Sequence, residues 1–183
     1  MPEANELIIE TPRTLIVTTP SEALERHASL DEFEIDVEID GAPRPVRVPP
    51  GWPGDDLDGL PDLLRLRSER RAEPWSGMVI DRDSLEAVGQ IGCTALPDAE
   101  GRVEVRYATV VGRRDRGIAT EAGGAFVEWL LERPDVSAVV AECLVTNAAS
   151  VRVLEKTGFE LAEEREEPSG RLLRWVRHSV RSG

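Results

Sequence analysis

The chain has 183 residues, and its 40% apolar and 31% charged residues are typical of a single globular domain with its own hydrophobic core. The formal net charge of −13 disfavours nucleic acid as a partner, because its phosphates would be repelled. No apolar run approaches the ~18 to 20 residues of a membrane span, and the acidic amino-terminal segment lacks a secretory signal, so we expect a cytoplasmic protein that binds no membrane.

The amino-terminal part is predicted to alternate strands and helices. Residues 11–18 have the composition of a strand. Thr19 to Glu22 resembles a capping box, which predicts a helix running to about Leu30. Residues 33–39 alternate apolar and acidic side chains, as a half-buried strand does.

The next stretch is dominated by proline and glycine. Residues 40–61 are predicted to form a long irregular connection, of the kind that covers binding sites. Residues 61–71 are rich in leucine and arginine at roughly helical spacing, which predicts a helix.

From residue 75 onward the pattern of elements is clearer. Three strands in a meander, an amphipathic helix, a strand buried on both faces, a short helix closed by Gly158 and a final hairpin follow one another. The strands and helices are predicted over residues 75–81, 88–96, 103–111, 117–132, 136–145 and 148–157. This order predicts an α/β (α+β) sandwich in one domain, 1–183, with a mixed sheet between helices on both faces.

The cysteines and histidines give no sign of a metal site. Cys93 and Cys143 lie in apolar, strand-like segments, which favours two buried thiols over a disulfide. His27 and His178 are far apart, and neither belongs to a cluster with metal-ligand spacing. We therefore expect surface histidines and no metal.

A basic, glycine-containing loop lies between a predicted strand and the amphipathic helix. Unpaired N–H groups at a helix start suit a phosphate, Gly117 allows close approach of the anion, and Arg114 and Arg116 add cationic donors. The spacing matches neither a Walker loop nor a dinucleotide fingerprint. The alternative is a plain basic turn with a helix cap.

A second motif begins at Asn147, which has the position of a helix cap, with Ser150 three residues later. Alone this run is explained by ordinary capping. Taken together, however, Arg114-x-x-Gly117-x-Ala119 and Asn147…Ser150…Leu154-Glu155-Lys156…Gly158-Phe159 resemble the GNAT N-acetyltransferases of the RimJ/RimL type. The strong resemblance covers residues 75–160, and the rest agrees in element order, including the TPR-x-LIV run that starts at Thr11.

The resemblance implies a mostly antiparallel sheet that splays between its fourth and fifth strands, with the pantetheine arm of acetyl-CoA in the gap. It implies that loop N–H groups hold the pyrophosphate, that strand backbone pairs with the pantetheine amides by strand addition, and that Asn147 touches the same arm. The loop residues concerned are Arg114, Arg116, Gly117, Ile118, Ala119 and Thr120, and the strand residues are Val110 and Val111.

The chain departs from the family pattern at two positions. Many members carry a tyrosine in the later helix as the acid that protonates the leaving thiolate, where this chain has Leu154. The family's Glu-Ile-Gly-Tyr run is here Glu104-Val105-Arg106-Tyr107, so that Arg106 replaces a small residue and could change the acceptor side.

The chemistry implied is direct attack of a neutral amine on the thioester, assisted by Glu104 as base and Ser150 as acid. The alternatives are a solvated strand residue or an Arg106 ion pair for Glu104, and a hydroxyl near the cap for Ser150. Val103, Val105 and Tyr107 should face a helix, with Glu104 and Arg106 on the opposite face.

Three functions stay open. The first is an acetyl-CoA-dependent N-acetyltransferase acting on a small-molecule amine or a protein N-terminus, the second a non-catalytic acyl-CoA-binding regulatory module, and the third an unrelated phosphate-binding domain. The proline-rich stretch, 40–61, and the first helix are expected to form the acceptor side. A homodimer is expected on general grounds alone.

Overall fold

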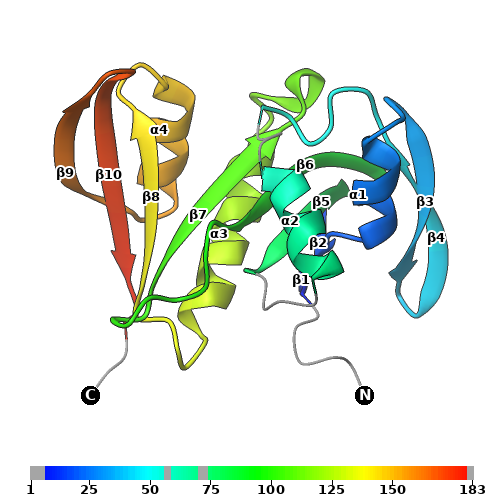
Figure 1. The fold of residues 1–183 in the computed structure, drawn as a ribbon, viewed down its shortest axis with the longest axis horizontal. Coiled ribbons are helices and arrows are strands. Elements are labelled where there is room, and N and C mark those ends of the chain that lie inside the picture. The colour runs from blue at the N-terminus through cyan, green and yellow to red at the C-terminus, as the bar shows by residue number, and fades with distance from the viewer. Residues whose placement is uncertain (1–6, 56–58, 70–73, 181–183) are drawn as a thin grey trace.

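A computed structural model describes residues 7–55, 59–69 and 74–180, which form a ten-stranded sheet with four α-helices (Figure 1). The strands are β1 (Ile8–Glu10), β2 (Thr14–Thr18), β3 (Phe33–Ile39), β4 (Ala42–Val48), β5 (Ser76–Asp81), β6 (Glu86–Cys93), β7 (Arg102–Thr109), β8 (Ala138–Leu144), β9 (Glu160–Glu167) and β10 (Gly170–His178). The helices are α1 (Ser21–His27), α2 (Gly59–Ser68), α3 (Ile118–Leu131) and α4 (Ala148–Lys156), with a short 3₁₀ turn, η1 (Val111–Arg113).

The sheet is mixed and mostly antiparallel, as the sequence predicted. Its order is β1-β2-β5-β6-β7-β8-β10-β9, and along this path β7 and β8 are the parallel neighbours. The β3–β4 hairpin joins the sheet at one point, where Arg47 of β4 lies opposite Glu86 of β6.

The two faces of the sheet carry separate cores, because successive side chains of a strand point to opposite faces. Leu15 and Val17 of β2 pack in one core with α1, α2 and the β3–β4 hairpin. Ile16 of the same strand packs in the other core with α3 and α4. Helices on both faces are therefore confirmed.

Strands β7 and β8 separate soon after they meet. They pair in parallel from Arg102 to Glu104, opposite Ala138 to Val140, and then diverge (Figure 1). The remainder of β7 keeps its antiparallel partner β6 on the other side. The expected splay between two neighbouring strands is thus present, and it opens one edge of β7 over residues 105–109.

The predicted start of the first helix is wrong. Pro20, with no side-chain hydrogen bond, is the N-cap residue, and α1 ends at His27 rather than Leu30. Thr19 does not cap the helix, because its side chain is buried and its hydroxyl accepts a hydrogen bond from Gln90 Nε2 at 2.7 Å. A tertiary hydrogen bond has replaced the local one.

The prediction of a long irregular connection over 40–61 is also wrong in part. Residues 42–48 form β4, which pairs with β3 along its whole length, and α2 starts at Gly59. Proline cannot donate to a ladder, but Pro43 and Pro45 are exposed on a strand whose second edge meets β6 only at Arg47. Within the predicted connection and the helix predicted after it, residues 56–58 and 70–71 lie outside the described part of the chain.

Strand β1 was not predicted, and the other elements lie within three residues of their predicted bounds. Cys93 and Cys143 are buried free thiols, and Gly158 has the left-handed φ of +80° expected after α4. Val103 and Val105 pack against α3 with Tyr107 at their border, as the alternation of β7 predicted. Among the described residues, no helix is long and apolar enough to cross a membrane.

Candidate active site

A cleft of about 560 Å³ opens where β7 and β8 separate. Its walls are the end of β7, the loop leading into α3, and the first turns of α4. The two sequence motifs therefore meet in space although some thirty residues separate them. The predicted site residues that line the cleft are Arg114, Gly117, Ile118, Ala119, Thr120, Asn147 and Ser150.

The other predicted residues lie outside this lining. The backbone carbonyl of Arg116 accepts a hydrogen bond from Arg13. The Val110 N–H donates to the Val88 carbonyl at 2.9 Å, and the carbonyls of Val110 and Val111 accept from the N–H groups of Arg113 and Arg114. The backbone polar groups of Val110 already have protein partners, so they are not free for the strand addition predicted for this residue.

The pairing pattern of β7 shows which of its backbone groups face the gap. In an antiparallel pair, hydrogen-bonded and non-bonded positions alternate. Val110 bonds to Val88, and Glu104 accepts from Thr94, so the even-numbered residues of β7 face β6. The backbone groups of Tyr107 and Thr109 consequently point toward the gap, which shifts the predicted pairing site by one residue or more.

Gly117 starts α3 in a conformation that other residues resist. Its φ is +76°, in the left-handed region, and a Cβ atom placed there would lie 3.3 Å from Arg13 Nη2. A residue with a side chain costs roughly 1–2 kcal/mol in this region. Glycine thus lets the loop turn into the helix while the N–H groups of the first turn stay exposed to the cleft.

An arginine near the amino terminus clamps this loop from one side. Arg13 Nε donates to Glu121 Oε2 at 2.6 Å, and Arg13 Nη1 donates to the Arg116 carbonyl at 2.8 Å. Thr11 Oγ1 also donates to Glu121, at 2.6 Å. Burial by itself would raise the pKa of Glu121, but the hydrogen bonds from Thr11 and Arg13 outweigh it and lower the pKa.

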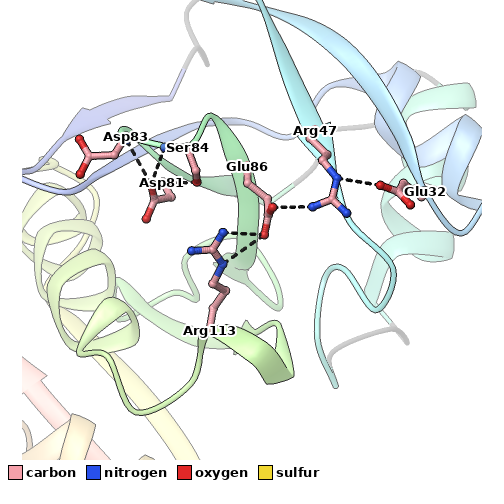
Figure 2. Close-up of polar contacts among 7 residues, drawn as sticks. All are labelled: Glu32, Arg47, Asp81, Asp83, Ser84, Glu86 and Arg113. Carbon is pink, nitrogen blue, oxygen red and sulfur yellow. Dashed lines mark hydrogen bonds and ion pairs between the residues drawn. The ribbon is translucent and has the colours of Figure 1, made fainter.

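A second arginine clamps the loop from the opposite side. Figure 2 shows Arg113 of η1 facing Glu86 of β6, to which it donates from Nε at 3.1 Å and from Nη2 at 2.9 Å. Glu86 also accepts from Arg47 at 2.6 Å, and Arg47 bonds Glu32 at 2.7 Å. The alternating charges of Arg113, Glu86 and Arg47 thus connect the loop to the β3–β4 hairpin. Figure 2 shows them next to the turn at Asp81.

Arg114 is one of the cationic residues that line the cleft. Its Nε donates to the Thr109 carbonyl at 3.2 Å, and its Nη2 donates to Asp55 Oδ2 at 2.5 Å. Asp55 is 80% exposed and follows the buried Trp52 in the described part of the proline-rich stretch. The Arg114 guanidinium, which the sequence assigned to a phosphate, therefore already has a carboxylate as its partner.

The start of α4 is held by the cap that the sequence predicted. Asn147 Oδ1 accepts a hydrogen bond from the Ser150 N–H at 3.1 Å. Arg152 and Lys156 line the cleft from the same helix. Leu154 is 2% exposed and packs in the core, so the position that carries a tyrosine in many relatives does not face the cleft here.

Glu104 lies beside the point where the strands separate. It is half-buried, and no hydrogen bond or ion pair forms with its carboxylate among the described residues, so the expected alternative of an Arg106 ion pair is not formed. Burial and the neighbouring Glu142 raise its pKa above 4.5. Glu142 itself is held by Arg165 and Arg174 at 3.1 and 2.9 Å.

A smaller cavity of about 250 Å³ lies on the face that carries α1 and α2. Its walls include Leu60, Leu63 and Leu66 of α2, and Ser76 and Gln90 of the sheet. Arg106 lines both this cavity and the large cleft.

Several residues of this site went unpredicted. The Thr11-Pro-Arg13 run was noticed without a role, and the only local signal for Arg113 was its place beside Arg114. Asp55 gave no readable pattern, and Arg152 and Lys156 stood within the second motif without a role. The partners of Arg13, Arg113 and Asp55 are distant in sequence, which is why spacing along the chain could not find these contacts.

Comparison with known proteins gives the same result at the level of sequence and of structure. Residues 26–160 match the model of the acetyltransferase (GNAT) domain. The chain is 31% identical over 115 residues, 60% of its length, to an uncharacterized N-acetyltransferase, YjdG, of Bacillus subtilis, of which this covers 67%. It is 30% identical over 95 residues to a second Bacillus subtilis protein of that description, YoaA, and spans about half of it (52%).

Solved structures share the fold at low identity. A GNAT-family acetyltransferase from Bacillus anthracis superposes with a TM-score of 0.65 at 16% identity, over 96% of this chain and all of the other. The ribosomal-protein-S5-alanine acetyltransferase of Vibrio fischeri gives 0.66 at 14%, over 95% and 97%. RimL, a ribosomal L7/L12 α-N-protein acetyltransferase in complex with coenzyme A, also gives 0.66 at 14%, over 94% and 98%.

Proposed function

Because the chain belongs to the GNAT acetyltransferase family and is an N-acetyltransferase, we propose that it uses acetyl-CoA as donor and acetylates a primary amine of a small molecule or a protein N-terminus. The observation that carries this proposal is the 560 Å³ cleft at the splay of β7 and β8. A basic loop, the start of α3 and the capped start of α4 converge on it.

The pyrophosphate of CoA fits the start of α3. The first-turn N–H groups of Ile118, Ala119 and Thr120 have no helical acceptor, and the positive end of the helix dipole favours an anion there. The clamps made by Arg13 and Arg113 hold the loop in place before ligand arrives. Less ordering is then needed on binding, which favours affinity.

The pantetheine arm fits the open edge of β7. Its amides can pair with the backbone groups of Tyr107 and with the Thr109 N–H, which point into the gap, while Asn147 and Ser150 form the opposite wall. The Thr109 carbonyl already accepts a hydrogen bond from Arg114. Arg114 already holds Asp55, so a phosphate that reaches this guanidinium competes with that carboxylate.

Glu104 is the group best suited to take a proton from the attacking amine. An alkyl ammonium with a pKa near ~10 must lose a proton before it can attack. A glutamate whose pKa is raised by burial and by Glu142 accepts that proton more readily than an exposed one. Ser150 is the residue that the sequence assigned as acid, and it lines the cleft on the far side of the gap.

The acceptor fits the 250 Å³ cavity under α2, which shares the lining residue Arg106 with the large cleft. Leucines of α2 give this cavity an apolar wall. The sequence predicted that the proline-rich stretch and the first helix form the acceptor side, whereas the apolar wall of this cavity comes from α2. RimL, a neighbour of the same fold, acts on a ribosomal protein, which supports a protein N-terminus as one acceptor class.

The deciding experiment measures release of free thiol from acetyl-CoA with a panel of amines and peptide N-termini. Acetylation of any member with stoichiometric thiol supports the proposal. Tight acetyl-CoA binding without thiol release across the panel would favour the non-catalytic module instead. The expected homodimer, the cytoplasmic location and the expected lack of a metal stay predictions.

A further inference from the structure

Tyr107 is the single tyrosine of the chain, and it lies across the gap between β7 and β8. Its ring borders the core on the α3 face. Its hydroxyl donates to the carbonyl of Ser150 on α4 over a long 3.5 Å, and Ser150 lines the same cleft. A side chain of β7 thus reaches the helix that carries the acid in many relatives.

The surroundings of Tyr107 keep its hydroxyl protonated. Burial raises the pKa of Tyr107, the hydrogen bond with Ser150 opposes this effect, and the neighbouring thiol of Cys143 on β8 adds to it. From α3 it faces apolar side chains, Ile118 and Ala122. The charged residues of the surrounding cleft wall are Asp55, Arg106, Arg113, Arg114, Asp115, Arg152 and Lys156.

The alternatives at this wall are less suited to donate a proton. Leu154 has no proton to give and is buried in the core. Ser150 has an aliphatic hydroxyl, which is a far weaker acid than a phenol. Although burial raises its pKa, the phenol of Tyr107 is still a much stronger acid than an aliphatic hydroxyl, so of the two it is the better donor to a developing thiolate.

We propose that Tyr107, rather than Ser150, is the acid that protonates the departing sulfur of CoA, an inference that rests on the proposed acetyl transfer. The amine nitrogen forms a bond to the acetyl carbonyl carbon as the carbon–sulfur bond breaks. The electron pair of that bond stays on sulfur, which takes the proton from Tyr107 Oη. Glu104 passes the proton taken from the ammonium to solvent before the attack and then takes the surplus proton of the attacking nitrogen, and solvent finally resets the tyrosinate and the protonated Glu104.

The main test compares Tyr107→Phe with Ser150→Ala. Phenylalanine keeps the ring packing and removes only the hydroxyl. We expect Tyr107→Phe to lower kcat by about 10²-fold, the lower end for loss of a general acid because a thiolate leaves readily. CoA affinity should stay within about twofold, which corresponds to less than 0.5 kcal/mol. Ser150→Ala should lower kcat by less than Tyr107→Phe does, because an aliphatic hydroxyl is the weaker acid.

A second measurement uses the single tyrosine as a spectroscopic probe and needs no turnover. The near-ultraviolet titration of the wild-type tyrosine is followed with CoA and with desulfo-CoA, which lacks the thiol. If the sulfur lies beside Tyr107, CoA alone should move this titration upward, because a thiolate disfavours the tyrosinate. The Tyr107→Phe variant should also lose the preference for CoA over desulfo-CoA at alkaline pH.

The outcomes separate the two proposals. No acetylation by the wild-type protein would overturn acetyl transfer and this inference together. If the wild type is active and the Tyr107→Phe variant is equally active, only the role of Tyr107 is overturned. The same holds if activity is lost in Ser150→Ala but not in Tyr107→Phe. Identical tyrosine titrations with CoA and desulfo-CoA would overturn it too, whether or not the variant folds.

Discussion

The proposed donor side and the proposed acceptor side of the sheet are built in different ways. On the donor side, a loop, a helix start and a capped helix come from two short motifs, and two arginine clamps hold the loop between β2, β6 and α3. On the acceptor side, the apolar wall comes from α2, and its sheet residues come from three strands. The donor side thus presents backbone groups in fixed positions, while the acceptor side presents side chains that substitution can change without moving the sheet.

This difference predicts that changes on the two sides have separable effects on binding and turnover. Donor-side changes should act on CoA affinity, since the loop N–H groups bind substrate and transition state alike. Changes next to the acceptor cavity should act on turnover or on the KM of the amine. Variants on each side test whether CoA affinity and turnover change separately.

The largest effect is expected for Glu104→Gln, which should lower turnover by roughly 10² to 10⁴-fold because a general base is lost. CoA affinity should be unchanged. Wild-type activity should fall as pH drops and Glu104 is protonated, and the raised pKa of Glu104 should place this acidic limb above that of an ordinary glutamate. The limb should flatten in the variant. Near-wild-type rates from pH 6 to 9 would assign the proton to water instead.

The next largest effect is expected for Gly117→Ala on CoA binding. The left-handed φ of +76° makes a side chain cost roughly 1–2 kcal/mol, which is about 5- to 30-fold in affinity if the loop shifts to relieve it. Calorimetric titration with CoA measures the change, and turnover at saturating CoA should be nearly normal. Gly112→Ala is the matched control, because nothing lies within 4 Å of a Cβ atom there. Equal affinities for the two variants would contradict a phosphate site at Gly117.

A smaller effect is expected for Leu66→Ala on the acceptor side. This leucine lines the 250 Å³ cavity and is only half-buried, so truncation removes part of an apolar contact worth about 1 kcal/mol, or about fivefold in KM for an apolar amine. CoA affinity should not change. Leu96→Ala, at an exposed leucine outside the cavity lining, serves as the control in the same kinetic assay. A KM that moves equally in both variants would remove the cavity as acceptor site.

The smallest effect is expected for Glu121→Gln, which weakens the Arg13 clamp. Loss of its charged hydrogen bonds should lower the free energy of unfolding by about 1 kcal/mol at pH 7, since Arg13 is half exposed. The pKa of Glu121 is lowered in the folded state, so its contribution is complete above the unfolded pKa and is lost as pH falls through the folded one. Denaturant unfolding at pH 7 and pH 3 should show the difference shrinking. Glu25→Gln, on an exposed residue of α1, is the control.

Much of the fold could be predicted because its signals are local. The alternation of Val103, Val105 and Tyr107 identified the buried face of β7, and apolar spacing identified α3. Strand β4 was missed because its prolines argue against a strand, and only its position at a nearly unpaired edge makes them tolerable. Thr19 was misassigned as a cap because a hydrogen bond to Gln90, 71 residues away, replaces the local one.

The same distinction applies to the candidate site. Gly117, Asn147 and the loop that joins Arg114 to Thr120 could be found from the sequence by itself, because a helix start and its cap are determined by residues within one turn of each other. Tertiary structure decided that Arg13 would hold Glu121, that Arg113 would face Glu86, and that Tyr107 would reach Ser150. These contacts join residues 27 to 108 positions apart, and they depend on strand register and on how helices pack across the sheet, which spacing along the chain does not encode.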